Sequence, residues 1–391
     1  MTAPPLAGVR VVEYAQYVAG PLCGVVLGDL GAEVIKVEPP AGDGYRYVMP
    51  VAVGLGRYFI PLNRGKRSVI LDLKAEEGRA RSAALLASAD IVIHNYAPPR
   101  DAAFGLDWDS VYAVKPRVVV GVVSSFGSSG PLAGTPAYDL VAQARSGLLT
   151  AHAGPGDTVP VRAGGIPLAD LTAGYLLTSE VLAALVSARA SGVGRLVDVS
   201  LLAAALAVQV QDLVWLEGEA GETARTATAA DLSARAAEIG GGIAMNPYYR
   251  CYETRDGFVA VACLNVAQRR AFARLFGIED PTIRAPDIVP EDESLLAVKE
   301  DLTRRIERAI ADDSAAALLE RLGGAGVPAS PVLVRESVHG DAQVAASGLI
   351  ARVDQPGLGP VQMLRSLVGS RSAEPAPQLG ADTESVLREL A

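Results

Sequence analysis

The 391-residue chain is poor in the residues from which disulfide frameworks, zinc sites and histidine-based catalytic centres are built. Its three cysteines are odd in number and show no CxxC spacing, so a disulfide framework or a structural zinc site is excluded. Its three histidines are too scattered for an HExxH-type centre. We therefore expect no metal site. These residues are Cys23, Cys251, Cys263, His94, His152 and His339.

Positive charge and long apolar runs are also scarce. Lys and Arg number 35 against 44 Asp and Glu, for a formal net charge of −9. This balance argues against a nucleic-acid partner, which needs a broad basic face, but it allows a small anion at a local basic cluster. The most apolar run, Leu201–Val208, is far shorter than the ~20 residues of a membrane span. The start, MTAPPLAGVR, lacks a signal-peptide pattern, so we expect a cytoplasmic protein without membrane contact.

Familiar nucleotide and hydrolase motifs are missing too. No GxGxxG follows the first predicted strand, and no GxSxG occurs. The segment Gly65-Lys66-Arg67-Ser68 resembles a P-loop only faintly, because Ile60 replaces its first glycine and a strand follows it.

The first half of the chain instead alternates predicted strands and helices. Glycine and proline break points and alternating or continuous apolar runs predict strands at 9–14, 33–38, 68–73, 90–95, 116–124 and 196–201. Helices are predicted between them, including 75–89 and a long one from Asp170 to Ser191. The spacing of these βαβ units predicts an α/β fold with a doubly wound parallel sheet.

The composition changes near residue 217 and predicts a second unit. Residues 217–239 are small and polar and predict a linker; 240–324 predict a smaller α+β domain with a hairpin at 248–263 and helices at 266–276 and 294–322. Residues 1–216 then form the first part of a large domain, and 325–391, with a helix at 382–390, are expected to return and complete it.

Three local features could carry chemistry, and each also has a purely structural interpretation. The cluster Asn63–Arg67 is either a solvated turn or an anion site in which Arg64, Lys66 and Arg67 contact phosphates. Asp170 is either a helix N-cap or a carboxylate nucleophile held ionised by the helix dipole. Gly240, Gly241 and Gly242 are either a plain connection or a mobile flap.

Seven blocks in order resemble the class III CoA-transferase family (CaiB/BaiF type), which also contains the α-methylacyl-CoA racemases. The blocks are GVRVVEYAQYVAGPLCGVVLGDLGAEVIKVEPP, FIPLNRGKRSVILDLK, DIVIHNYAPP, FGSSGPLAGTPAYDLVAQARSGL, LADLTAGYLL, GGGIAMNPYYRCYETRDGFVAVAC and GVPASPVLVRESVHGDAQV. The resemblance implies a Rossmann-like CoA-binding domain, a smaller domain, and a homodimer of two interlocked chains. It also implies that an acyl-CoA and a carboxylic acid are the substrates, with coenzyme A as co-substrate and no permanently bound cofactor.

The resemblance assigns roles to individual residues. Asp170 matches the family's catalytic aspartate, which forms an acyl anhydride and then an aspartyl-CoA thioester, and the glycine flap would exclude water from both. CoA-binding positions are implied for Val18, Ala19, Leu71, Asn95, Tyr96, Phe104 and Tyr138. Pro39, Ala103 and Pro136 stand where some members carry a basic residue, and Arg100 is a candidate substitute for the one at 103.

Two alternatives remain open at this point. The racemases place a histidine where this chain has Tyr138, and a phenol is poorly matched to proton abstraction at neutral pH, so transferase is favoured over racemase. The missing basic residues would also fit a non-catalytic acyl-CoA-binding paralogue, although Asp170 is retained. Few cations are available for a second substrate carboxylate, which favours a monocarboxylic or hydrophobic acid; Arg162 or Arg250 would change that preference.

Overall fold

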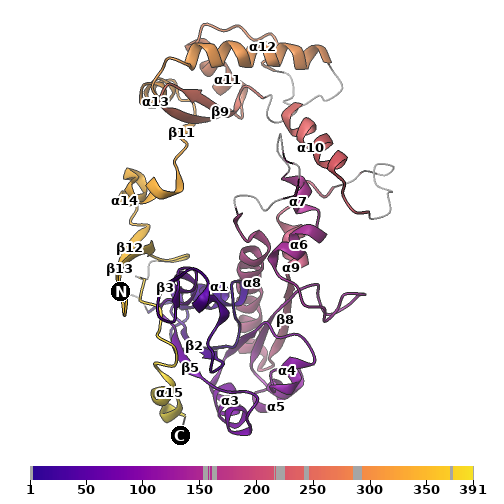
Figure 1. The fold of residues 1–391 in the computed structure, drawn as a ribbon, viewed down its shortest axis with the longest axis vertical. Coiled ribbons are helices and arrows are strands. Elements are labelled where there is room, and N and C mark those ends of the chain that lie inside the picture. Colours follow the sequence, from indigo (N-terminus) through magenta and orange to yellow (C-terminus); the bar gives the residue numbers. More distant parts are fainter. Residues whose placement is uncertain are drawn as a thin grey trace. The chain divides into compact units, whose positions relative to one another are not determined.

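The computed structural model describes residues 3–152, 157, 159–160, 165–214, 216, 225–241, 246–284, 293–369 and 373–390. The chain divides into two compact units (Figure 1). Unit 1 comprises Met1–Leu149, Arg162–Glu222 and Ala342–Ala391, and unit 2 comprises Thr150–Val161 and Thr223–Asp341. The chain therefore passes from unit 1 into unit 2 twice, at Thr150 and at Thr223, and its final return to unit 1 begins at Ala342 rather than at the expected residue 325.

Unit 1 is built on a six-stranded sheet in which every neighbouring pair is parallel. Its strand order is β5-β2-β1-β6-β7-β8, so the order reverses between β1 and β6. This is the order of a doubly wound sheet, and it confirms the predicted fold class. The strands are β1 (Arg10–Glu13), β2 (Glu33–Glu38), β5 (Arg67–Ile70), β6 (Ile91–His94), β7 (Val119–Ser124) and β8 (Arg195–Ser200).

Helices cover both faces of this sheet, and each face has its own core. Neighbouring strand residues point to opposite faces, so Val11 joins one core and Val12 the other. The first core packs against α1 (Ala19–Asp29), α8 (Leu168–Ser191) and α9 (Leu201–Ala207). The second packs against α3 (Glu76–Ser88) and α5 (Trp108–Val114).

One of these helices, α8, is long and apolar enough to cross a membrane by length and composition. The sequence analysis did not identify this helix, because it took Leu201–Val208 as the most apolar run of the chain. In the structure, Ala173, Leu177, Val181 and Leu185 of α8 are buried in the first core. The helix ends at Gly192, whose φ of 75° gives the left-handed C-cap that glycine favours.

The C-terminal segment covers the edge of the sheet. Asp382 and Ser68 of β5 exchange hydrogen bonds: Ser68 N donates to Asp382 Oδ2 (2.9 Å) and Asp382 N to Ser68 O (2.9 Å). Ile70 N also donates to Thr383 Oγ1 (3.0 Å) at the start of α15 (Thr383–Glu389). An edge strand that would otherwise expose its backbone is thereby satisfied.

Two hairpins of unit 1 were not predicted: β3 (Pro50–Ala52) with β4 (Leu55–Gly56), and β12 (Ile350–Gln355) with β13 (Gly359–Leu364). They contribute to one small core. The other helices described in unit 1 are η1 (Gly44–Tyr47), α2 (Phe59–Asn63), α4 (Arg100–Ala103), α6 (Asp139–Arg145) and α14 (Ala342–Ala346), and α7 (Leu148–Ala151) begins in this unit and ends in unit 2.

Unit 2 contains an antiparallel sheet of order β11-β10-β9. Its helices pack around Phe272, Ile306 and Leu318. The single helix expected at 294–322 is two helices, because Ser314 caps a new one by accepting from Ala317 N (3.2 Å). The elements are α10 (Ala229–Gly241), β9 (Tyr249–Thr254), β10 (Gly257–Ala262), α11 (Val266–Leu275), α12 (Glu293–Ile310), α13 (Ala315–Gly324), β11 (Ala329–Pro331) and η4 (Arg335–Gly340).

The predicted linker and glycine flap need correction. Helix α10 occupies the second half of the expected linker, and Gly240 and Gly241 are its last two residues rather than a loop. Gly242 and residues 217–224 lie outside the described residues.

Candidate active site

The site forms where the strand order of the sheet reverses, at the carboxyl ends of β1 and β6. The loops that follow these strands are joined by a reciprocal pair of hydrogen bonds. Gln16 N donates to Asn95 Oδ1 (3.1 Å), and Asn95 Nδ2 donates to Gln16 O (2.9 Å). Gln16 Nε2 also donates to Tyr96 Oη (3.2 Å). Doubly wound sheets bind ligands at this position, and Asn95 fixes the two loops that border it.

A cavity of about 480 Å³ lies beside these loops. It brings together six of the residues expected at the site: Val18, Ala19, Asn95, Tyr96, Tyr138 and Asp170. Gln16, Tyr17, Arg100, Pro136, Ala137 and Leu201 are among its other lining residues. The cavity therefore joins the candidate nucleophile to positions implied for CoA.

Asp170 lies in the first turn of α8, and Asp139 caps that turn. The helix begins at Leu168 and its N-cap is Pro167, so the interpretation of Asp170 as the N-cap is wrong. The Asp139 carboxylate instead accepts from Ala169 N (3.0 Å) and Asp170 N (3.3 Å), and its other oxygen accepts from Gln143 Nε2 (2.7 Å). The free N–H groups and dipole of a first turn stabilise a carboxylate anion.

Glycine at position 174, one turn beyond Asp170, brings α8 close to α1. A Cβ atom there would lie 2.8 Å from Ala19 O and 2.8 Å from Leu22 Cδ2. A larger residue would push the helices apart. Gly174 therefore holds the Asp170 turn beside the start of α1, which carries Val18 and Ala19.

A second cavity of about 190 Å³ adjoins the first, and the two share Gln16, Tyr96 and Arg100. Leu71 and Phe104, both expected at the CoA site, line this smaller cavity together with Lys74. The rings of Phe104 and Tyr96 meet edge to face, with centroids 5.3 Å apart. The two cavities thus provide a continuous set of lining residues, and the smaller one is lined by two cations, Lys74 and Arg100, and by two carboxylates, Glu38 and Asp72.

The basic cluster at 63–67 does not contribute a phosphate clamp, so that prediction is wrong. Arg64 is buried and makes a bidentate ion pair with Asp29, at 2.6 and 2.7 Å. Lys66 is buried and donates to Glu13 at 2.8 and 2.9 Å. Arg67 pairs with Glu33 and Glu389. These cations balance acidic residues of unit 1 and are absent from the two cavity linings.

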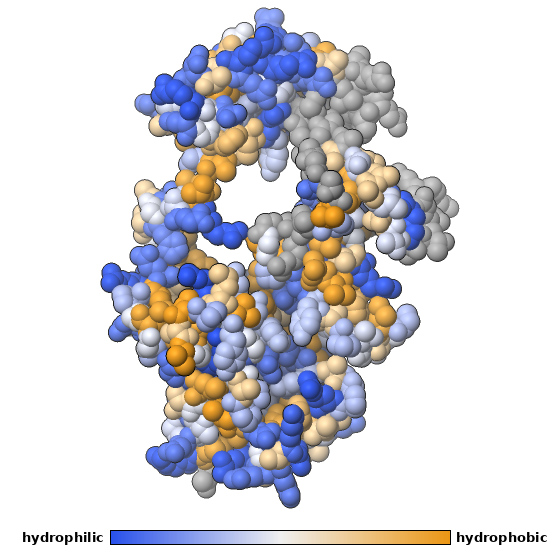
Figure 2. All heavy atoms as spheres, viewed as in Figure 1, coloured by the Kyte–Doolittle hydropathy of each residue, from blue (hydrophilic) through white to orange (hydrophobic). Residues whose placement is uncertain are grey.

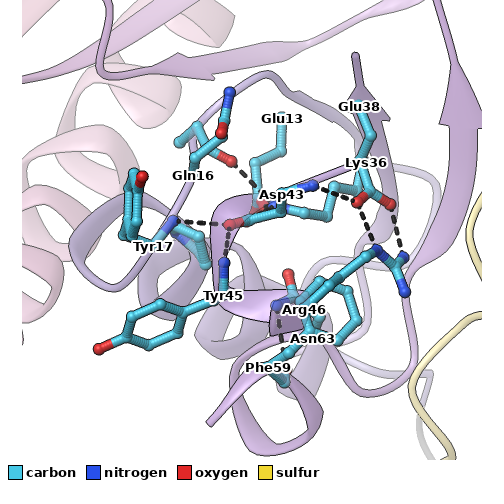
Figure 3. A network of polar contacts seen from close by, with 12 residues as sticks. Glu13, Gln16, Tyr17, Lys36, Glu38, Asp43, Tyr45, Arg46, Phe59 and Asn63 are labelled. Atoms are coloured by element: carbon cyan, nitrogen blue, oxygen red, sulfur yellow. Dashed lines mark hydrogen bonds and ion pairs between the residues drawn. The ribbon is translucent and has the colours of Figure 1, made fainter. Parts of the chain in front are cut away.

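Beneath the loop after β1 lies a buried ionic network that the sequence did not reveal (Figure 3). Lys36 Nζ contacts Glu13 Oε1 (3.1 Å) and Asp43 Oδ2 (2.9 Å), and it donates to Ala15 O (2.8 Å). Burial disfavours the charge of Lys36, but Asp43 and Glu13 outweigh burial and raise its pKa. Burial dominates at Lys66 and lowers its pKa to about 8.

Asp43 connects this network to the cavity. Its Oδ1 accepts from Tyr17 N (3.2 Å) and Tyr45 N (2.9 Å), as the dashed lines in Figure 3 show. Tyr17 has a φ of 70°, a conformation that a residue with a side chain rarely adopts. Sequence analysis missed both residues, because a left-handed tyrosine leaves no local signal.

The parallel sheet, with a cavity where its strand order reverses, places the chain in the class of doubly wound α/β proteins. A family model described as CoA-transferase family III matches residues 6–383. The chain belongs to this family, which confirms the predicted resemblance, and it is therefore a class III CoA-transferase.

Similar proteins agree with this assignment. A succinate–glutarate CoA-transferase of Agrobacterium fabrum is 32% identical, over 99% of this chain and 96% of its own. An acetyl-CoA:oxalate CoA-transferase of Acetobacter aceti is 30% identical over 89% and 86%. The crystal structure of a CaiB/BaiF family protein from Brucella suis superposes with a TM-score of 0.81, at 28% identity, over all of both chains.

Proposed function

We propose that Asp170 is the nucleophile that carries CoA from an acyl-CoA thioester to a carboxylic acid. The observation that carries this proposal is that Asp170 lies in one cavity with Val18, Ala19, Asn95, Tyr96 and Tyr138. A carboxylate in the first turn of a helix is favoured as the anion, which is the form that attacks. The smaller adjoining cavity carries Arg100 and Lys74, which can pair with the anionic part of CoA, and of its two carboxylates, Glu38 and Asp72, the first is already paired with Arg46.

Each proposed step exchanges one acyl bond for another. An Asp170 oxygen attacks the thioester carbonyl, the C–S bond breaks and CoA leaves as a thiolate, giving a mixed anhydride. The thiolate then attacks the aspartyl carbonyl, so the donor acid leaves as a carboxylate and an aspartyl-CoA thioester remains. An acceptor carboxylate attacks this thioester and releases the thiolate again, which attacks the acceptor's carbonyl and regenerates Asp170. No proton or electron is gained or lost overall.

Trapping the intermediate tests this proposal. We expect CoA to pass from at least one acyl-CoA in a panel of donors to at least one of a panel of carboxylic acids. Hydroxylamine added during turnover should convert Asp170, and no other residue, to a hydroxamate visible by peptide mass spectrometry. Acyl-CoA binding without modification of Asp170 would instead indicate a binding protein. Deuterium uptake at the α-carbon of a 2-methylacyl-CoA would indicate the racemase reaction.

We further propose that the protein acts as a homodimer of interlocked chains in the cytoplasm. Support comes from exposed apolar side chains on unit 1, where hydrophobic atoms gather in the region of α6 and α9 (Figure 2). They include Leu140 and Val141 of α6 and Leu206 of α9. Patches of this kind mark interfaces. Light scattering should give twice the chain mass of 40.4 kDa, and a single-chain mass would contradict the proposal.

A further inference from the structure

Four tyrosines form a connected group at the cavity that holds Asp170, although only 5% of the chain is aromatic. Tyr17 meets Tyr138 edge to face, with ring centroids 5.7 Å apart, and meets Tyr45 in the same way at 5.7 Å. Tyr45 in turn lies 6.0 Å from Tyr58. Tyr17 thus links Tyr138 to the other two rings, and both Tyr17 and Tyr138 line the cavity.

The position of the Tyr17 ring is set by unusual backbone features. Its φ of 70° is held by the hydrogen bond from its N–H to Asp43, which the buried Lys36 holds in turn. Glycine at residue 44 lets the Tyr17 ring lie against the backbone, because a Cβ atom there would lie 2.8 Å from Tyr17 Oη and 3.0 Å from Tyr17 Cζ and the ring would have to shift. Backbone strain that surrounding contacts maintain is found preferentially at functional sites.

The charges of the cavity lining are unevenly distributed. Among the described residues that line the larger cavity, Arg100 is the only cation; it also lines the smaller cavity, where Lys74 is accompanied by the acidic residues Glu38 and Asp72. The larger cavity, but not the smaller one, is lined by Tyr17, Tyr138 and Asp170. Apolar side chains of Val18, Pro136 and Leu201 accompany them. Beside these tyrosine rings and apolar side chains, a second substrate carboxylate out of reach of Arg100 would lose its hydration without gaining a cation from the described lining residues, which is costly.

We propose that Tyr17 is a specificity-determining residue whose ring, with that of Tyr138, receives the acyl group of the thioester and selects an aromatic monocarboxylic acyl group over a dicarboxylic one. An aromatic acyl group gains buried area and edge-to-face contacts with these rings, whereas a dicarboxylic group gains neither. The inference rests on the proposed function, because it places the scissile thioester beside Asp170.

The test compares three donors with one acceptor: 3-phenylpropionyl-CoA, butyryl-CoA and succinyl-CoA. We expect kcat/KM for 3-phenylpropionyl-CoA to exceed that for succinyl-CoA by at least about tenfold, since one aromatic contact with its buried area is worth that factor. Tyr17→Ala should lower kcat/KM for 3-phenylpropionyl-CoA by about tenfold and that for butyryl-CoA by less than about threefold. Tyr17→Phe retains the ring and should keep the preference.

The control is Tyr47→Ala, which removes an exposed tyrosine outside both cavities. This substitution should change kcat/KM neither for 3-phenylpropionyl-CoA nor for butyryl-CoA. Tyr138→Ala removes the partner ring from an exposed position and gives the same comparison if Tyr17→Ala does not fold. Equal or better use of succinyl-CoA, or an equal loss with all three donors in Tyr17→Ala, would overturn the inference.

A binding measurement separates this inference from the proposed function. Calorimetric titration of Asp170→Asn with the same three thioesters reports the preference without turnover. Tighter binding of 3-phenylpropionyl-CoA than of succinyl-CoA, by at least about tenfold, supports the role of Tyr17 even if no donor supports transfer. Failure of transfer with every donor then counts against the proposed function alone. Equal binding of the two thioesters overturns the inference itself.

Discussion

Asp170→Asn should lower kcat for CoA transfer by at least about a thousandfold, since removal of a catalytic nucleophile typically costs this much or more. An amide nitrogen and oxygen lack the anionic charge with which Asp170 would attack the thioester. The substitution preserves the size of the side chain, and only part of that side chain is buried. We therefore expect the variant to fold, to bind acyl-CoA and to fail in turnover. Steady-state kinetics and a thermal melt of the same preparation measure both properties.

Two other aspartates provide matched controls for this substitution. Asp139→Asn keeps one oxygen for the N–H groups of Ala169 and Asp170, so it should lower kcat by only about tenfold, the cost of a weakened helix cap beside the nucleophile. Asp109→Asn changes an exposed residue of α5 and should have no effect. Retention of a tenth or more of the wild-type kcat by Asp170→Asn would rule out the nucleophilic role.

The large sheet could be predicted because each strand is a short local pattern. Runs such as Val9–Tyr14 and Asp90–Asn95 are buried on both faces of the sheet and flanked by residues that end strands. The edge contact between Ser68 and Asp382 could not be predicted in the same way. It joins residues 314 positions apart, and no local pattern encodes such a pairing.

The density of positive charge in the cluster Asn63–Arg67 led to the incorrect prediction of a phosphate site there. Arg64 and Lys66 lie close together in the sequence, but their partners are Asp29 and Glu13, on a different helix and strand. A sequence shows which cations are neighbours and does not show which carboxylates the fold brings to them. Asn95, in contrast, was implied by the family resemblance, and the structure places it directly after the buried strand β6, at the edge where doubly wound sheets bind ligands.

The same limit explains the absence of Tyr17 and Asp43 from the predicted site. Asp43 acts through its contacts with Lys36 and with the backbone of Tyr17, which lie in other segments of the chain. Tyr17 acts through a backbone angle that its residue type disfavours. Both features arise from tertiary structure.

Lys36→Met should destabilise the protein by about 3–5 kcal/mol, the usual effect of removing one partner of a buried ion pair. Lys36, Glu13 and Asp43 have no exposed side-chain surface, so water cannot replace the lost ammonium group. Glu13 retains Lys66, whereas Asp43 loses its ion pair and Ala15 O loses its donor. Urea unfolding should show a lower midpoint for Lys36→Met than for wild type with a similar slope.

The control is Arg81→Met, which breaks a surface pair with Glu77 on α3 and should cost no more than about 0.5 kcal/mol. Lys36→Arg keeps the charge in a larger side chain, so its loss of stability should lie between those of Lys36→Met and Arg81→Met.

In the folded fraction of Lys36→Met, a loosened Asp43 no longer fixes Tyr17, so KM for the acyl-CoA should rise while kcat changes less. An unfolding midpoint equal to that of Arg81→Met would show that the network does not stabilise the fold. A normal KM in the folded fraction would show that Lys36 does not position Tyr17.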